Sequence, residues 1–172
     1  MVLGDVQPLE PPDTHYLSAA LGWVELGNLA EAKAELAQLG QSRQNHPDVL
    51  EVRWLICAEE HHWQEGLQVA RALMFAAPDR SSGWLHQAYA LRRAPGGSVQ
   101  KAWEALLPAF DLFPREAIIC YNLACYACQM HQLEVARVWL KRAQAIGQQE
   151  QIRQMALSDA DLEPLWTEIR QW

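Results

Sequence analysis

Three cysteines stand within nine residues of one predicted helix, a type and spacing that metal or redox chemistry would require. Cys125 and Cys128 are one helical turn apart, and Cys120 precedes them. A structural zinc site needs a second pair of ligands, which the sequence lacks, and a thioredoxin-type pair lies at a helix start after a strand. We interpret them as small core residues and expect no metal and no cofactor. A metal- or redox-responsive module is the most distant alternative.

Histidines stand at predicted turns, where an imidazole would be available as a base or a metal ligand. His61 and His131 hold equivalent positions in two copies of a repeated pattern, so we expect them a full unit apart rather than around one ion. The nearby Glu59-Glu60 pair lacks a nucleophile and an orienting third group. The Pro-Gly-Gly sequence at 95–97 lacks the lysine and the strand of a phosphate loop. We therefore predict that the protein is not an enzyme.

The charge balance argues against some classes of partner. The net charge is −7, and only three of the 14 basic residues are lysine, whereas binding to a nucleic-acid backbone depends on clustered positive charge. No apolar run is long enough to cross a bilayer, and the first residues, MVLGDVQPLEPPD, lack both the basic and the apolar part of a signal peptide. We expect a soluble, cytoplasmic protein without nucleic-acid or membrane partners, whose four cysteines are free thiols.

Helices must position these residues, because alanine is abundant and β-branched residues are few. Residues 1–12 carry three of the nine prolines and predict an extended lead-in. Helical spacing of apolar residues, with glycine and proline at the ends, predicts helices over residues 14–26, 29–42, 47–60, 63–76, 81–92, 99–112, 116–130 and 133–145. Pro108 lies inside the sixth, so we expect a bend near Glu104, whose carbonyl group loses its donor.

The same residue types return every 34 to 36 residues along this series of helices. Turn positions fall at Gly27, His61, Gly97 and His131. Small residues, which allow two helices to cross closely, fall at Ala32, Gly66, Ala102 and Ala136. Space-filling positions between helices fall at Leu36, Ala70, Leu106 and Leu140. Repeats of this kind stack, because no single copy can bury its apolar face alone.

A 34-residue unit of two helices, with a small residue at the crossing and a closing proline, resembles the tetratricopeptide repeat of small bacterial-type proteins. In the fourth unit Leu123-Ala124 stands where the family has a Leu-Gly pair, and in the second unit Arg53-Trp54 stands there. The resemblance implies an all-α, right-handed solenoid of four helix-turn-helix repeats, over residues 13–46, 47–80, 81–116 and 117–146.

Residues 147–172 do not form a fifth unit, and we expect them to cap the solenoid with a pair of helices. The first helix is predicted over residues 149–156, with Ser158 as the N-cap of the second. An apolar stripe follows at Leu162, Leu165, Trp166 and Ile169. A solenoid needs such a cap because its last repeat otherwise exposes its stacking face.

Stacked first helices would line a concave groove, which is the candidate functional surface. By the repeat register, its candidate partner-binding residues are Glu51, Leu55, Glu59, Tyr89, Arg92, Arg93, Tyr121, Asn122 and Gln129, with Leu17, Leu21 and Glu25 at the same positions of the first unit and Leu85 and Cys125 at those of the third and fourth. Aromatic, amide and charged groups together suit recognition of a peptide or helix.

We therefore predict a non-catalytic protein–protein interaction scaffold or adaptor that binds a peptide or helix. One alternative is a homo-oligomeric structural subunit. Another is a small chaperone of a secretion system, a class of repeat proteins of similar length and acidity.

Overall fold

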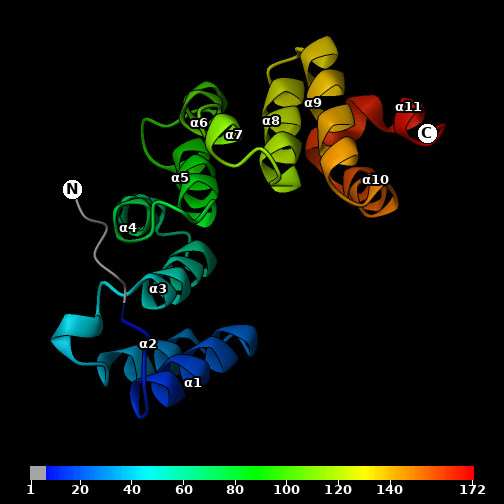
Figure 1. The fold of residues 1–172 in the computed structure, drawn as a ribbon. Helices are drawn as coiled ribbons and strands as arrows, with labels where there is room; N and C mark the ends of the chain where they lie inside the picture. The colour runs from blue at the N-terminus through cyan, green and yellow to red at the C-terminus, as the bar shows by residue number, and fades with distance from the viewer. Residues whose placement is uncertain (1–6) are drawn as a thin grey trace. The chain divides into compact units, whose positions relative to one another are not determined.

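The computed structural model describes residues 7–172, which form helices and connecting turns with no strand (Figure 1). The longer helices are α1 (Asp13–Glu25), α2 (Leu29–Ala37), α3 (Pro47–Glu59), α4 (Trp63–Ala76), α5 (Ser82–Arg93), α6 (Val99–Leu106), α8 (Ala117–Gln129), α9 (Leu133–Ile146) and α10 (Gln149–Ser158). Shorter helical segments are η1 (Gln41–Arg43), α7 (Ala109–Leu112), η2 (Ala160–Leu165) and α11 (Trp166–Ile169). The predicted all-α class is confirmed. None of the helices described is long and apolar enough to cross a membrane.

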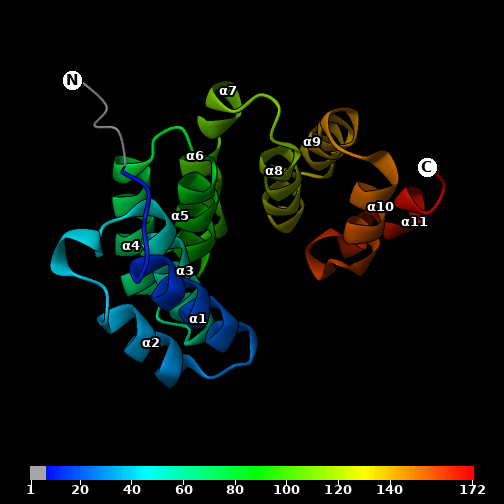
Figure 2. The same ribbon diagram turned by 60° about the horizontal axis from the view of Figure 1, so that its bottom comes forward.

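The helices form two compact units, of which the first ends at His86 and the second begins at Gln87, inside α5. Each unit is larger than one of the four sequence repeats, and the two are called the first and second units below. In the first unit α1 packs on α2 and α3 packs on α4, and α1 also lies against α3. In the second unit α8 packs on α9, and α10 follows on α9 (Figure 2). Of the predicted extended lead-in, residues 1–6 lie outside the described part. Residues 7–10 are not helical, and Leu9 packs on the core of the first unit.

Tight turns at the predicted positions join the helices of three pairs. Gly27, His61 and His131 all have the left-handed backbone, with φ of 74°, 58° and 60°. In the third repeat the left-handed residue is Gly96 and not the predicted Gly97, because the turn between α5 and α6 is two residues longer than the other three. Gly97 is required for a different reason, since a Cβ atom there would lie 1.8 Å from the carbonyl oxygen of Leu91.

Two predicted helices are shorter than expected. The helix predicted over residues 29–42 ends at Ala37, because Gly40 takes an extended conformation with ψ of 150° before η1 begins. The helix predicted over residues 99–112 is broken into α6 and α7 rather than bent near Glu104. The break lies at Leu107 and Pro108, where proline has no N–H to continue the α-helical hydrogen bonds.

The second helix of the predicted cap is also different. The Ser158 hydroxyl donates back to the Gln154 and Met155 carbonyl groups, and Asp159 is the N-cap instead, since its carboxylate accepts from the Asp161 N–H. Pro164 interrupts the helix that follows, so a 3₁₀ segment and one short α-helical turn replace it. The apolar stripe itself is buried at Leu162, Leu165 and Ile169.

Candidate functional site

In the second unit, three groove positions of the repeat register contact the chain's own C-terminal segment, defined here as Asp159–Leu165. The Tyr121 hydroxyl donates to the Asp159 carboxylate over 3.0 Å, and the Cys125 thiol lies 3.5 Å from the same carboxylate. The Gln129 side-chain amide donates to the Asp161 carbonyl oxygen over 3.3 Å. Tyr121, Cys125 and Gln129 are four residues apart in sequence, so they form one stripe along α8.

Arg92 of α5 holds the C-terminal segment through a two-pronged ion pair with Asp161. One guanidinium nitrogen lies 2.7 Å from one carboxylate oxygen, and another donates to the second oxygen. The hydrogen bonds from Arg92 to Asp161 raise the pKa of the guanidinium, against the opposing effect of burial. Both side chains are about four-fifths buried, and charge-assisted pairs with this geometry are among the stronger polar contacts.

Tyr121 is therefore not the accessible groove residue that the sequence predicted. Its side chain is only 5% exposed, because the C-terminal segment covers the stripe of α8 on which it lies. Burial raises the pKa of its hydroxyl, and the neighbouring Cys125 and Asp159 act in the same direction. The phenol is consequently a hydrogen-bond donor to Asp159 at any physiological pH.

The other groove residues predicted in the second unit make local contacts. The Asn122 side chain donates to the Ile118 carbonyl oxygen over 2.9 Å, one turn earlier on α8. The Arg93 guanidinium lies 3.5 Å from the centroid of the Tyr89 ring and donates to the Tyr89 carbonyl oxygen. Tyr89 and Arg93 thus form a cation–π pair on α5.

In the first unit the same register positions line an open cleft between α1 and α3. Its volume is about 600 Å³. It is lined by Pro8, Leu9, Thr14, Leu17, Ser18, Leu21, Asp48, Glu51, Val52 and Leu55. The predicted residues Glu51 and Leu55, with Leu17 and Leu21, therefore do come together. Leu21 keeps 38% of its surface exposed and forms part of an apolar floor open to solvent.

Glu51 is held at the end of the cleft where α1 and α3 begin. It accepts hydrogen bonds from the Ser82 hydroxyl and from His86, whose Nε2 lies 2.7 Å from the carboxylate. The His86 ring stacks on Trp54 with centroids 3.8 Å apart, which fixes its orientation. Burial raises the pKa of Glu51, but these hydrogen bonds outweigh it and the net pKa is lowered. Glu51 is therefore ionised above acidic pH, with its charge already engaged.

The opposite end of the cleft has a different character. Glu25 and Glu59 are the last residues of α1 and α3, each one turn beyond a leucine of the cleft floor. Both side chains are exposed, and no ion pair or hydrogen bond engages either of them in the described part of the chain. By contrast, Asp48, which lines the cleft near the start of α3, is paired with Arg80 over 2.6 Å. Uncompensated negative charge therefore gathers where α1 and α3 end.

The four cysteines are buried core residues. All of them keep their thiols inside the helix pairs, with Cys57 in the first unit and the other three on α8. Burial raises the pKa of Cys57 to about 11 and raises the pKa of Cys120, Cys125 and Cys128. Buried, protonated thiols are poor nucleophiles. Among residues 7–172 no three His, Cys, Asp or Glu side chains come together as a metal site.

Sequence reasoning missed the residues that complete these two surfaces. The sequence marked only Ser158 as a cap, and no local pattern connects Asp159 and Asp161 with Arg92, which stands 69 residues from Asp161. His86 lies one residue after Leu85, a groove position, so the repeat register could have predicted that His86 lies close to Glu51. No model of a known protein family matches the chain, and no curated protein matches it.

Proposed function

We propose that this chain is a non-catalytic protein–protein interaction module, built as a right-handed solenoid of four tetratricopeptide-type repeats. The observation that carries the proposal is the open, apolar cleft between α1 and α3. It lies at the positions that the 34-residue register marks as groove positions, and its size suits the side chains of one turn or two of a bound helix.

The second unit supports this proposal with an internal example. There, the equivalent positions on α8 receive a peptide segment, Asp159–Leu165, whose Leu162 and Leu165 are buried and whose carboxylates are bound by Arg92 and Tyr121. The groove positions hold a segment of the same chain in the second unit. We therefore expect the groove positions of the first unit to hold a peptide of a partner.

The homo-oligomeric subunit is kept as the second candidate because of one side chain. Phe75, near the end of α4, is 80% exposed. Large exposed apolar side chains occur at subunit interfaces, although single ones are common on monomers. Light scattering of the full chain tests it: a dimer that Phe75→Ser converts to a monomer would favour this candidate.

Selection from a displayed peptide library tests the interaction module. The full chain is immobilised and offered random peptides of about 15 residues, long enough for about four helical turns. The variant Leu21→Glu/Leu55→Glu places charge on the cleft floor, and Leu112→Glu places it on an exposed leucine of the second unit as the control. Circular dichroism verifies that all three chains are folded.

We expect enriched peptides that bind the unmodified chain and the Leu112→Glu control but not the cleft variant. The proposal would be wrong if no peptide is enriched, or if the enriched peptides bind the cleft variant equally well.

A further inference from the structure

Formal charge is divided unequally between the two units. Residues 1–86 contain twelve acidic and five basic side chains, whereas residues 87–172 contain nine of each. The whole net charge of −7 therefore belongs to the unit that carries the open cleft. The electrostatic field of this negative unit attracts cationic partners and repels anionic ones.

Within the first unit, the charge near the cleft is uncompensated at one end only. Arg80 and His86 engage the carboxylates of Asp48 and Glu51 where α1 and α3 begin. Among residues 7–172, Glu25 and Glu59 have no such partner, and neither helix has a basic residue in its last turn. Because the C-terminus of a helix is itself partially negative, both glutamates stand where they reduce helix stability. A cation placed there would relieve both effects.

Charge matching already governs the equivalent surface of the second unit. Its C-terminal segment contains three acidic residues, Asp159, Asp161 and Glu163, and no basic one. Arg92 and the donor groups of Tyr121 and Gln129 receive that segment. An acidic segment lies on a face that offers cationic and donor groups, so we expect the apolar cleft of the first unit, with Glu25 and Glu59 at one end, to bind a segment of the opposite sign.

We propose that the cleft between α1 and α3 binds an amphipathic segment of a partner protein that carries lysine or arginine at one end of its apolar stripe. Its apolar side chains lie on Leu17, Leu21, Val52 and Leu55, and its basic end lies beside Glu25 and Glu59. This inference rests on the proposed function of the cleft. It also rejects the acidic C-terminal segment of a second copy as the occupant, because like charges would meet.

The peptides enriched on the full chain test the proposal through their charge. We expect cleft-dependent peptides with leucine-type residues at helical spacing and a net positive charge. Cleft-dependent peptides that are neutral or acidic would overturn this inference and leave the proposed function standing. A failure to enrich any cleft-dependent peptide would overturn both.

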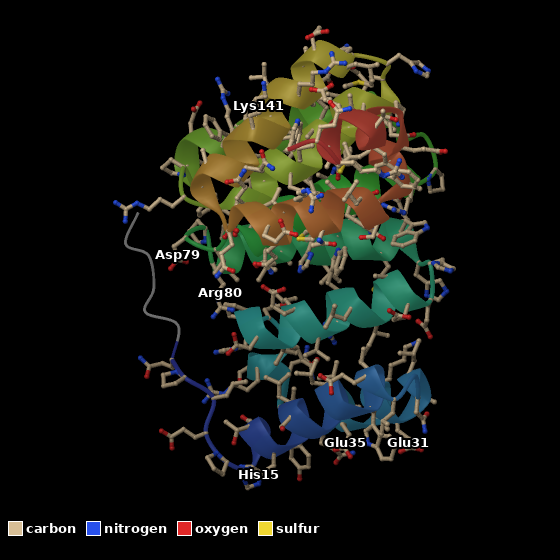
Figure 3. The ribbon with its side chains drawn as sticks, turned by 90° about the vertical axis from the view of Figure 1, so that its right-hand side faces the viewer. His15, Glu31, Glu35, Asp79, Arg80 and Lys141 are labelled. Carbon is tan, nitrogen blue, oxygen red and sulfur yellow. The ribbon has the colours of Figure 1, made fainter. Side chains whose placement is uncertain are left out.

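A matched pair of variants then locates the basic end, with one enriched peptide as the fluorescent probe. Glu25→Gln/Glu59→Gln removes two negative charges beside the cleft, and Glu31→Gln/Glu35→Gln removes two from α2, away from the cleft lining (Figure 3). We expect the first variant to lose about tenfold in affinity at low ionic strength, a loss that shrinks at high salt. The control should lose about twofold at most. Equal losses in the two variants would contradict the placement of the basic end.

Discussion

At the scale of single residues, the backbone conformation decides whether glycine stabilises or destabilises the fold. Gly27 has φ of 74° with open space around it, whereas Gly22 lies inside α1, also with open space. Glycine suits the first position and weakens the second, since a helix interior prefers alanine. The two glycines therefore provide substitutions of opposite sign within one helix pair.

We expect Gly22→Ala to stabilise the protein by about 0.5–1 kcal/mol and Gly27→Ala to destabilise it by about 1–2 kcal/mol. Denaturant unfolding measures both. If Gly27→Ala raises the free energy of unfolding, the left-handed turn assigned to this residue is wrong.

The small residues at the helix crossings provide a second test. Ala136 is completely buried between α8 and α9, and the substitution Ala136→Leu should destabilise the protein by about 1–3 kcal/mol through overpacking. Val138→Leu on the exposed side of the same helix is the control and should change stability little. An unchanged melting temperature for Ala136→Leu would contradict the close crossing.

Cys57 gives the pH dependence of stability a predictable sign. Its pKa is about 11 in the folded chain, against 9.0 for an unperturbed thiol, because burial disfavours the thiolate. The folded chain therefore holds this proton more tightly, so its contribution to stability is complete below pH 9 and is lost as the pH rises toward 11. Cys57→Ala should flatten the decline in unfolding free energy over this range. An equally steep decline in the variant would assign the effect to other groups.

At the scale of elements, the limits of most helices followed from sequence pattern because capping and breaking residues act locally. The helix predicted over residues 63–76 is reproduced as α4. The turn at His61 sets its start, and Pro78 lies just beyond its end. The docking of the C-terminal segment on α8 could not be predicted. This docking depends on contacts between residues far apart in sequence. In addition, Pro164 interrupts the regular helix that the apolar stripe predicted, and a 3₁₀ segment forms instead.

A charge exchange tests that docking. Arg92→Asp should destabilise the second unit by about 1–3 kcal/mol, because Asp161 then faces a like charge in a partly buried site. The double variant Arg92→Asp/Asp161→Arg restores the opposite charges and should recover most of the loss. Asp111→Asn, at an exposed site in the same unit, is the control for loss of a carboxylate. If the double variant is no more stable than Arg92→Asp, the ion pair does not hold the segment.

At the scale of the whole molecule, one column of residues is covered in the second unit and open to solvent in the first. The repeat register selected a single column of residues. In the second unit this column holds the chain's own acidic segment, and in the first it lines an apolar cleft beside uncompensated carboxylates. Periodicity could identify the column because the repeats share it. Periodicity could not show which groove positions are open to solvent, because their burial depends on the C-terminal segment that follows the last repeat.

Hydrogen exchange of the full chain, with and without an enriched cleft-dependent peptide, tests this account most directly. The peptide should slow exchange in α1 and α3, over residues 13–25 and 47–59, where ordering of the cleft suppresses local opening. Exchange in α8 and in the C-terminal segment should stay the same, since that surface is already occupied. Protection confined to α8, with the C-terminal segment released, would instead show that partners displace the tail and that the cleft between α1 and α3 is not the binding site.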